Sequence, residues 1–478
     1  MLYFQTRIYN DYAKGLIFCD KISSVKVNDE IELNIEKIAD SSQGIAHYEG
    51  LVIFVDNTCV GDVIKAKVLK VNKNFAQAKL TEIITPSKYR VKPFCPMYNV
   101  CGACQLQHID YGYQLQIKKQ IVEDAMKNIA GLNVEVRDVI PSPEIMHYRH
   151  KIQYPVSQTK VSKRILAGYY KIKTHETVNL KYCPVQPEIC DRIIEYIREK
   201  AFDYAISGFN EKKHSGDLRH IVLRVSKATG KVLVVLVVNA TKSFAKLNDF
   251  AKDIYGNFKE VSGVCVNFNS KKTNVILGAN TECIAGKDFI KERICEKTFR
   301  IGANTFFQIN PKSAENIFLF VKDYIRDNFD KPLIMDAYAG ISAFGICVSD
   351  VAKKVVCVEE NKESVALAQK TAEVNEIENL ELHAMDTQKF FEKEISTKKR
   401  KFDVIILDPP RKGCSMETLK SILKLSKGKV IYVSCNPATL ARDLKFLSEN
   451  GADIEFVQPF DMFCHTTHVE SVAVIKIN

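Results

Sequence analysis

The chain has 478 residues, of which 46% are hydrophobic and 26% are charged, and its net charge is +11. This length exceeds one ordinary domain, so two to four domains are expected, and the apolar content excludes wholesale disorder. No run of 18 apolar residues is present, which predicts no membrane-spanning helix. Because no secretory leader is recognised, we expect a cytoplasmic protein whose fifteen cysteines stay reduced. The positive charge favours a polyanionic partner.

Residues 22–84 contain short apolar runs that alternate with polar residues, among them EIELNIEKI, LVIFV, VIKAKVLKV and AQAKLTEI. Turn signals separate these runs, and strands at this spacing predict a small β-barrel. The stretch SSQGIAHYEGLVIFVDNTCVGDVIKAKV resembles the TRAM domain, an oligonucleotide-binding (OB) type of barrel. The resemblance implies that residues 22–84 form an OB-like barrel that binds RNA.

The segment ITPSKYRVKPFCP, with its prolines and basic residues, marks a linker into a second unit over residues 85–300. In this unit YGYQLQIKKQIVEDAMKNIA and CDRIIEYIREKAFDY have the apolar spacing of helices. The stretch HIVLRVSKATGKVLVVLVVNA predicts a β-hairpin with KATGK as its turn. The sequence therefore predicts a central α+β domain, which also carries a group of cysteines.

From residue 301 to residue 478, apolar runs alternate with helical patterns. The runs PLIMDAYAG, KVVCVEE, KFDVIILDPP and KVIYVSC predict strands, and ESVALAQKTAEVNE and METLKSILKLS predict helices between them. This alternation predicts an α/β domain with a doubly wound, Rossmann-like parallel sheet. Ligands of such sheets bind at the carboxyl ends of the strands. The functional residues are therefore expected directly after each apolar run.

Polar residues follow these predicted strands. An acid at the end of the second strand can accept hydrogen bonds from ribose hydroxyls, and Glu359 and Glu360 both fit that place. Asp386, in ELHAMDTQKF, lies where an acid would meet an adenine amine. Asp408 begins an Asp-Pro-Pro element whose prolines fix φ and hold the acid at a strand tip. This pattern is typical of a nucleotide-type cofactor and of a nucleotide-base methyltransferase.

Six motifs carry a sharper resemblance. They are FFQIN, DAYAG, VCVEE, LDPPRKG, YVSCNPATLARDL and DMFCHTTHVESV, and they follow one another between residues 306 and 472. In order and spacing they resemble the RNA 5-methyluridine methyltransferases, which use S-adenosylmethionine to modify transfer or ribosomal RNA. The members with a TRAM domain and a four-cysteine site, which act on 23S ribosomal RNA, are most similar. The resemblance implies methylation of carbon 5 of a uridine, with 23S rRNA as the expected substrate.

The resemblance also implies roles for single residues. Cys435 matches the nucleophile and Glu470 matches the general base. The residues implied to bind the cofactor, S-adenosylmethionine, are Gln308, Tyr338, Glu359, Asp386 and Asp408. Glu359 is thereby preferred over Glu360 as the residue that holds the ribose.

The chemistry of uracil explains why a cysteine suits the first role. Carbon 5 is a poor nucleophile, and attack of a thiolate on carbon 6 gives an enolate that concentrates electron density on carbon 5. Cys435 follows the run KVIYV, so we expect it at a strand tip, where the helix beginning near PATLARDL is expected to lower its pKa. The uracil must leave its stack. The aromatic residues available to stack on it are Phe306, Phe307 and Phe463.

Four cysteines form a candidate metal site. The segment CPMYNVCGAC supplies Cys95, Cys101 and Cys104, and KYCPV supplies Cys183. Four thiolates can hold an iron–sulfur cluster or a zinc ion, and the spacing alone does not decide between them. The resemblance to the ribosomal RNA enzymes favours a [4Fe–4S] cluster. Because the methylation needs no electron, the cluster is expected to support the fold or RNA binding.

Three alternatives are weighed against this interpretation. The target uridine can lie in transfer RNA instead of 23S rRNA. A cytosine-5 methyltransferase uses a similar thiolate, but the set DPPR, SCNP and HVES argues against it. A non-catalytic RNA-binding protein with the same fold is disfavoured because Cys435 and Glu470 are both present. In every case RNA is the expected partner, and neither a membrane nor an obligate protein partner is expected.

Overall fold

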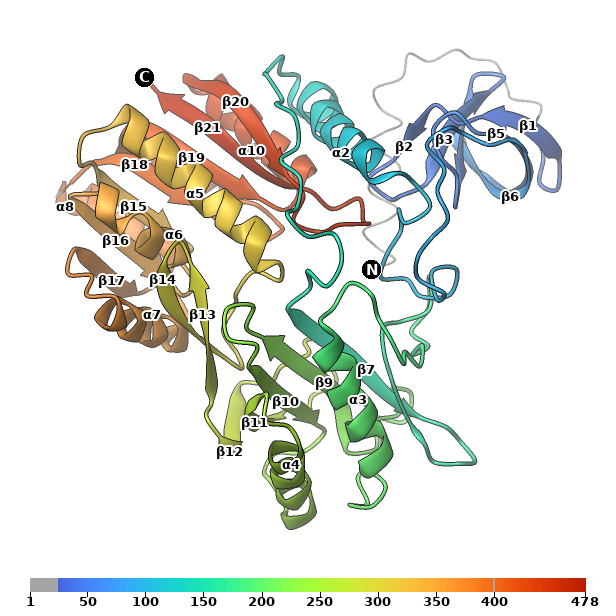
Figure 1. Cartoon of the computed structure of the whole chain (residues 1–478). Helices are drawn as coiled ribbons and strands as arrows, with labels where there is room; N and C mark the ends of the chain where they lie inside the picture. Colours follow the sequence, from blue (N-terminus) through green and yellow to red (C-terminus); the bar gives the residue numbers. More distant parts are fainter. Residues whose placement is uncertain (1–24, 399) are drawn as a thin grey trace.

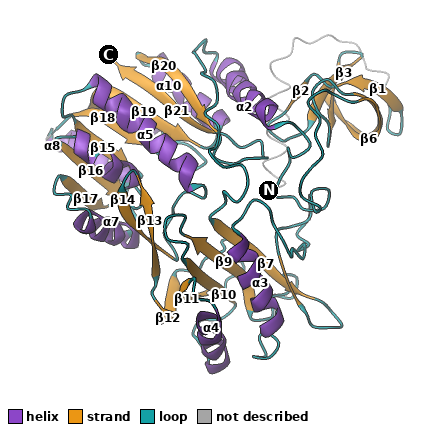
Figure 2. Cartoon of the chain, viewed as in Figure 1, coloured by secondary structure: helices purple, strands orange, loops and turns teal. Residues whose placement is uncertain are grey.

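The computed structural model describes residues 25–398 and 400–478, so residues 22–24 of the predicted barrel lie outside the described part. The described residues form three lobes: an N-terminal barrel, a central sheet and a C-terminal sheet covered by helices (Figure 1). The distribution of helices and strands among the lobes is seen in Figure 2. Within these ranges, no helix is long and apolar enough to cross a membrane.

The N-terminal lobe is a six-stranded sheet in the order β1-β5-β6-β4-β3-β2, in which β4 and β6 are parallel and the other neighbours antiparallel. Its strands are β1 (Glu30–Asn34), β2 (Lys37–Ile38), β3 (Gly44–Tyr48), β4 (Leu51–Val55), β5 (Val63–Val71) and β6 (Phe75–Thr85). In β1 the apolar residues Ile31 and Leu33 alternate with exposed residues and point into the barrel core. The alternating pattern of the sequence therefore builds the predicted barrel.

The central lobe is a six-stranded sheet in the order β12-β11-β10-β9-β7-β8. Its strands are β7 (Lys151–Gln158), β8 (Ile165–Ala167), β9 (Leu218–Val225), β10 (Val232–Val238), β11 (Val261–Phe268) and β12 (Asn280–Gly286). Helices α3 (Glu188–Lys200) and α4 (Ala245–Asn257) pack on one face of it. β9 and β10 form the predicted hairpin, with Val225 opposite Val232.

Strand β10 explains how the central lobe joins the next one. Its seven residues, VLVVLVV, are all buried. Val234 and Leu236 face the core with α3 and α4, whereas Leu233 and Val235 face a second core that includes the C-terminal lobe. An unbroken apolar run is what a strand covered on both faces requires.

The C-terminal lobe is a seven-stranded sheet in the order β17-β16-β15-β18-β19-β21-β20. Its strands are β15 (Leu333–Ala337), β16 (Lys354–Glu359), β17 (Leu380–Ala384), β18 (Phe402–Leu407), β19 (Ser426–Ser434), β20 (Ala452–Phe460) and β21 (Glu470–Ile477). The strands from β17 to β19 are parallel, while β21 is antiparallel to both β19 and β20. The predicted doubly wound parallel sheet is confirmed, with an antiparallel strand inserted near one edge.

Helices cover both faces of this sheet. One core contains α5 (Pro311–Asn328) and α6 (Ala343–Cys347), and the other contains α8 (Thr387–Thr397), α9 (Met416–Leu425) and α10 (Pro437–Glu449). Helix α7 (Lys362–Val374) lies beside β16 and β17, and the short 3-10 turn η2 (Ser349–Val351) follows α6.

The domain boundary at residue 300 is less sharp in space than in the sequence. It falls inside β14 (Lys297–Gly302), which pairs with β13 (Phe289–Ile294). Helix α2 (Tyr111–Ala125), with its π-helical extension η1 (Met126–Ala130), precedes that boundary but packs in the same core as α10. Val122 and Ala125 of α2 are thus buried by residues more than 300 positions further along the chain, whereas Ile117 and Ile121 pack in the core of the barrel.

Candidate active site

The predicted site residues follow the strands of the C-terminal sheet. Tyr338 comes directly after β15, Glu359 ends β16, Asp408 follows β18 and Cys435 follows β19. Because these four strands are parallel, their carboxyl ends meet at one edge of the sheet. One edge therefore gathers a tyrosine, two acids and a thiol from four separate parts of the sequence.

Strand β21 brings Glu470 to the same edge. Ser434 and Ser471 are direct partners in the antiparallel register of β19 and β21. Cys435 and Glu470 are the next residues toward the edge, so they face each other across the two strands. Glu470 is only 2% exposed, while Cys435 is half-buried. The register of the sheet thus joins the predicted nucleophile and the predicted base.

Burial and neighbouring charges shift the ionisation of this pair. Burial raises the pKa of the Cys435 thiol to about 11, the Glu470 carboxylate adds to the rise, and the Arg411 guanidinium opposes it. Burial also raises the pKa of Glu470 well above its usual value, and the Asp408 carboxylate adds to this rise. Helix α10 does begin two residues after Cys435, but the predicted net lowering of the thiol pKa is wrong, because desolvation outweighs it.

Two further acids lie near the strand tips: Asp336 is buried and Asp408 is partly buried. Burial raises the pKa of Asp408 to about 7. Burial also raises the pKa of Asp336, in β15, to about 7, and the nearby Asp408 carboxylate adds to the rise. Oδ2 of Asp336 accepts the Gly345 N–H at 2.9 Å, whereas its buried Oδ1 has no partner in the described protein. This edge of the sheet is therefore rich in carboxyl groups that resist ionisation.

The DAYAG turn and the end of β16 are tied together. Oε2 of Glu359 accepts the Gly340 N–H at 2.9 Å, and Oε1 accepts the Asn361 N–H at 2.8 Å. A carboxylate has about four acceptor positions, so both oxygens can accept further bonds from a ligand. Glu360, the alternative, is exposed. Glu359 is thus the acid that the structure fixes beside the small-residue turn.

Tyr338 and Asp386 line the next part of the edge. Tyr338 has a φ of +61°, a left-handed conformation that turns the chain sharply after β15. Its hydroxyl lies 3.5 Å from the Thr418 hydroxyl at the start of α9. Asp386 caps the N-terminus of α8 by accepting the Lys389 N–H at 3.0 Å. The carboxylate predicted to meet adenine therefore already has a structural role.

Gln308 does not lie among the residues at the strand tips. It lines a second cavity, between the central sheet and the start of α5, and has no hydrogen bond to the acids described above. Of the three aromatic residues predicted as stacking partners, Phe307 is buried in the core and Phe463 is partly buried, whereas Phe306 is 59% exposed. Phe306 is thus the aromatic ring most accessible to a ligand.

Residues of the central region hold the loop that leads to Glu470. The Lys118 ammonium of α2 donates to the Asp461 carboxylate at 2.5 Å and to the Phe463 carbonyl at 2.9 Å, and both ionic side chains are fully buried. The backbone N–H groups of Gln105 and Leu106 both donate to the His465 carbonyl at 2.9 Å. The position of Glu470 therefore depends on contacts far outside its own domain.

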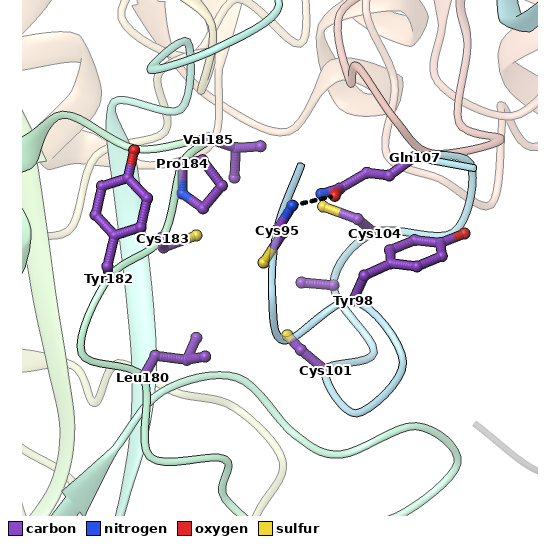
Figure 3. A pocket seen from close by; sticks show the side chains of 11 residues that line it. Cys95, Tyr98, Cys101, Cys104, Gln107, Leu180, Tyr182, Cys183, Pro184 and Val185 are labelled. Carbon is purple, nitrogen blue, oxygen red and sulfur yellow. Dashed lines mark hydrogen bonds between the residues drawn. The ribbon is translucent and has the colours of Figure 1, made fainter. Parts of the chain in front are cut away.

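The four predicted metal-ligating cysteines line one cavity. Cys95, Cys101 and Cys104 approach from one segment and Cys183 from the opposite wall, with their sulfurs directed toward the space between them (Figure 3). Among the described residues, no three His, Cys, Asp or Glu side chains are close enough to hold a single metal ion. The four thiols thus share one cavity but are not closed around a zinc ion, which would need all four sulfurs about 2.3 Å from one point.

Arg149 is a cation within electrostatic reach of this cavity. Against the effect of burial, its pKa is raised by Tyr169 and Tyr148 and also by the Cys183 and Cys104 thiols. The Nε of Arg149 is buried and has no hydrogen-bond partner in the described protein. An unpaired buried donor is costly unless something accepts from it. Four thiols and an unpaired cation fit a ligand that carries negative charge, as an iron–sulfur cluster held by thiolates does.

Two residues of the edge were not predicted from the sequence. Arg411, in the DPPRKG motif, acts on the pKa values of both Cys435 and Glu470. Asp336 is the acid of DAYAG, and its burial was not foreseen. Both residues belong to motifs that the sequence analysis singled out, so membership of these motifs could have marked them as functional. Their distance from the Cys435 thiol could not be predicted, because it depends on the order of the strands.

Three features define the class of this protein: parallel strands that end in acidic residues, a thiol that faces a carboxyl group, and an OB-like barrel. They are typical of an α/β enzyme with a nucleotide-type cofactor and a nucleic-acid-binding domain. The comparison with known families is more specific. The model of the tRNA (uracil-5-)-methyltransferase family matches residues 110–477, and that of the TRAM domain matches residues 24–81. The chain therefore belongs to the tRNA (uracil-5-)-methyltransferase family and carries a TRAM domain.

Relatives cover nearly the whole chain. An uncharacterized RNA methyltransferase of Clostridium tetani (strain Massachusetts / E88) is 38% identical over 451 residues, which are 94% of this chain and 96% of the relative. One of Bacillus cereus (strain ATCC 14579) is 36% identical over 458 residues, which are 95% of this chain and 98% of the relative.

A solved structure is similar over the same extent. It is the Pyrococcus abyssi tRNA (uracil-54, C5)-methyltransferase in complex with S-adenosyl-L-homocysteine, with a TM-score of 0.74 and 30% identity. The match covers 93% of this chain and 100% of that one. The predicted methyltransferase fold with an N-terminal TRAM domain is confirmed, and so is the assignment to the uracil-5 family of RNA methyltransferases.

Proposed function

We propose that this protein transfers a methyl group from S-adenosylmethionine to carbon 5 of a uridine in RNA, through a covalent bond between Cys435 and the uracil. The observation that carries the proposal is the register of β19 and β21. It sets the Cys435 thiol opposite the Glu470 carboxyl group at the edge where the strand tips meet. Both groups can then act on adjacent atoms of one pyrimidine ring.

The reaction needs one nucleophile and one base. The Cys435 thiolate adds to carbon 6, which makes carbon 5 nucleophilic toward an electrophilic methyl group. S-adenosylmethionine, when bound, supplies that methyl group from its sulfonium. The Arg411 guanidinium lowers the pKa of Glu470 against the effect of burial and so favours its carboxylate form. In that form Glu470 removes the proton from carbon 5, and the bond between Cys435 and carbon 6 breaks, which restores the double bond and releases the thiolate.

Arg411 helps to form the nucleophile. With a pKa of about 11, the Cys435 thiol is protonated at neutral pH in the free protein. The Arg411 guanidinium is the neighbouring group that lowers this pKa, and a positive charge beside a thiol favours the thiolate. Arg411 therefore stabilises the reactive form of Cys435 while RNA is bound.

The cofactor is held by the residues predicted for it. Glu359 accepts hydrogen bonds from the ribose hydroxyls beside the DAYAG turn, and Tyr338 lines the pocket. Asp386 lies near the adenine while it caps α8. Asp408 lies where the cofactor meets the uracil. Gln308 lines the second cavity, and its contact with the cofactor rests on the family resemblance alone. The support for the other four residues is their position at the carboxyl ends of the strands, and the similar solved structure contains S-adenosyl-L-homocysteine.

The cysteine cavity holds a [4Fe–4S] cluster in this proposal, with Cys95, Cys101, Cys104 and Cys183 as ligands. The gathering of the four thiols around one cavity and the unpaired Nε of Arg149 support it. The ligand loop also carries Gln105 and Leu106, whose N–H groups hold the His465 carbonyl. A cluster would thus stiffen the loop that positions Glu470, without a part in the methyl transfer.

The proposed substrate is 23S rRNA, in line with the resemblance of the TRAM domain and the four cysteines to the ribosomal RNA enzymes. Transfer RNA is the second candidate, because the solved relative from Pyrococcus abyssi is a tRNA (uracil-54, C5)-methyltransferase. Mapping of 5-methyluridine by mass spectrometry, in rRNA and tRNA from a deletion strain and its parent, tests both. We expect one or more 5-methyluridines of 23S rRNA to be lost. A loss confined to tRNA would select the second substrate, and unchanged RNA would contradict the proposed activity.

A further inference from the structure

A second cavity lies where the central sheet meets the C-terminal lobe. Residues of β7, of β9, of the β13–β14 hairpin and of the segment before α5 contribute to its wall. The polar residues that line it are His150, Lys151, Arg224, Glu292 and Gln308. Apart from Gln308, none of these takes part in the proposed methyl transfer.

Two cations face each other in this wall. Lys151 and Arg224 are direct partners in the antiparallel register of β7 and β9, and both line the cavity. Side chains of paired residues project from the same face of a sheet, and like charges in that position are destabilising. The repulsion between two such cations is relieved when a negative group binds between the two side chains.

The guanidinium of Arg224 is held in a fixed orientation. The side chain is 3% exposed, and Nη2 donates to the Ala303 carbonyl at 3.1 Å and also to the Thr305 carbonyl. Its Nε is buried and has no partner in the described protein. The residue is therefore positioned by the backbone and keeps one donor available.

The protein supplies no direct counter-charge. In the part of the chain that the structure describes, neither Lys151 nor Arg224 has a carboxylate oxygen within 4.0 Å, the limit for an ion pair. The Glu363 carboxylate acts on the pKa of Arg224 only from beyond that distance. Glu292 lines the cavity, but backbone N–H groups already occupy its oxygens. The donors are those of Lys227 at 2.7 Å, Ala228 at 2.9 Å and Arg293 at 3.0 Å. The pair of cations is thus left without an ion-pair partner.

The ionisation of Lys151 agrees with this geometry. Burial, together with the charges of Arg224 and Arg149, lowers its pKa to about 7. A lysine between two other cations is less easily protonated, and an anion at the same place reverses that effect. Binding of an anion would therefore restore the full charge of Lys151.

The cavity is one short segment away from the active site. The His150 N–H donates to the Ile309 carbonyl at 2.7 Å on the cavity side. On the other side, the Asn310 side chain donates to the Met462 carbonyl at 3.4 Å and the Ser313 hydroxyl to the Asp461 carbonyl at 2.9 Å. Those carbonyls belong to the loop that leads to Glu470. A group bound in the cavity therefore lies beside the chain that holds the proposed base.

We propose that Lys151 and Arg224 bind a phosphodiester of the RNA next to the uridine that is methylated. This inference rests on the proposed function, because it takes the ligand from the RNA substrate. Guanidinium and ammonium groups are the usual hydrogen-bond donors to the phosphates of nucleic acids. Such contacts fix the position of the RNA strand without recognising its sequence.

The test measures RNA binding rather than methylation. A fluorescein-labelled single-stranded RNA of about 20 nucleotides is titrated with the full chain over a series of KCl concentrations, and the anisotropy gives Kd at each salt concentration. The variants are Lys151→Gln and Arg224→Lys, and Lys252→Gln is the matched control. Lys252 is exposed on α4, which covers the other face of the central sheet.

We expect Lys151→Gln to weaken binding about tenfold at low salt and to reduce the slope of log K against log salt by about 0.7, the loss of one phosphate contact to a single strand. Arg224→Lys should also weaken binding, and the control should match the wild type. Removal of the repulsion should leave the Tm of the RNA-free Lys151→Gln protein equal to or above that of the wild type.

An unchanged salt slope in a folded Lys151→Gln protein would overturn the proposal. So would a selective loss of S-adenosylmethionine affinity in that variant, measured by calorimetry, because it would assign the cavity to the carboxylate of the cofactor. These outcomes are separate from a failure of the proposed function. That failure would appear as absent 5-methyluridine formation by the wild type, whatever the salt slope.

Discussion

The thiol of Cys435 is subject to charges of both signs. The carboxyl groups of Glu470 and Asp408 disfavour the thiolate, and the guanidinium of Arg411 favours it. Burial adds to the first effect, so the free protein holds a protonated and weakly reactive cysteine. Such a thiol is protected from oxidation and alkylation until a substrate changes its surroundings.

This balance makes the reactivity of Cys435 depend on pH. Since its pKa is about 11, the thiolate fraction should rise about tenfold for each pH unit between 7 and 10. Alkylation by iodoacetamide, followed by mass spectrometry of the Cys435 peptide, should rise by the same factor. Arg411→Gln should slow the reaction at pH 8 because it raises the pKa further, and Arg411→Lys should restore part of the rate. A rate that is already constant above pH 8 would contradict the raised pKa.

Removal of the sulfur tests the nucleophile. Cys435→Ala should form no covalent adduct with RNA that contains 5-fluorouridine, because no thiolate is left to add to carbon 6. Denaturing gel electrophoresis of labelled RNA detects the adduct. Cys190→Ala, which changes a buried cysteine of α3, is the matched control and should form the adduct normally. An undiminished yield with Cys435→Ala would remove Cys435 from the role.

Replacement of the carboxyl group tests the base. Glu470→Gln keeps the size of a side chain that is 2% exposed, but it cannot take the proton from carbon 5. We expect turnover to fall by about 10² to 10⁴-fold and the methylated covalent complex to accumulate. Time-resolved gel analysis with radiolabelled S-adenosylmethionine follows both. The control Glu360→Gln changes an exposed residue and should behave as the wild type. Fast turnover by Glu470→Gln would exclude Glu470 as the base.

At the scale of elements, helix α2 acts as a support for a loop of another lobe. Lys118 lies on α2, and Asp461 and Phe463 belong to the loop between β20 and β21. The Tyr111 hydroxyl donates to the second oxygen of Asp461 at 2.8 Å, so both oxygens are satisfied. A fully buried ion pair of this kind fixes one arrangement of the two elements, since any other leaves a charge unpaired.

Loss of one partner should therefore be costly. Lys118→Met leaves the buried Asp461 carboxylate without its cation and should lower the free energy of unfolding by about 3 to 5 kcal/mol. The double variant Lys118→Met/Asp461→Asn should recover a large part of this loss, because the unpaired charge is gone. Urea unfolding followed by circular dichroism measures both. Equal stability of the single variant and the wild type would show that the pair does not hold the loop.

The sequence predicted the elements whose pattern is local. Four of the five parallel strands after residue 301, the β9–β10 hairpin and the placement of Cys435 at a strand tip all follow from apolar runs and turn residues. The pairing of Lys151 with Arg224 could not be predicted from local pattern, because the register between two strands about seventy residues apart is set by packing. The burial of Lys118 was also unforeseen, since its partner lies 343 residues away. Local sequence pattern therefore predicts whether a segment is a helix or a strand. The burial and the charged neighbours of a side chain depend on residues that are distant in the chain.

At the scale of the whole molecule, the cysteine cavity connects the lobes. Its ligand loop bonds to the His465 carbonyl, and Cys464 packs in one apolar cluster with Tyr148 and Cys183. The Thr467 hydroxyl donates to the Asp40 carbonyl of the barrel at 2.6 Å. The loop before Glu470 thus touches the barrel and the cysteine region at once, so occupancy of the cavity should affect stability more than chemistry.

This can be measured by removal of the ligands. Protein purified without oxygen should be brown and contain iron and sulfide, and Cys104→Ser and Cys183→Ser should lose both. We expect a lower Tm in each variant, because an empty cavity releases the loop. Cys190→Ala again serves as the control, with its iron content unchanged. Stoichiometric zinc without iron in the wild type would contradict the iron–sulfur assignment.

The insertion of β21 between β19 and β20 has a consequence for how the molecule assembles. β20 and β21 are neighbours in sequence and form an antiparallel hairpin, which must then dock as a unit against β19. Docking closes a long-range contact, and such steps are slow compared with hairpin formation. The thiol and the carboxyl group therefore meet only when the sheet is completed. During refolding, catalytic competence should appear after most of the secondary structure has already returned.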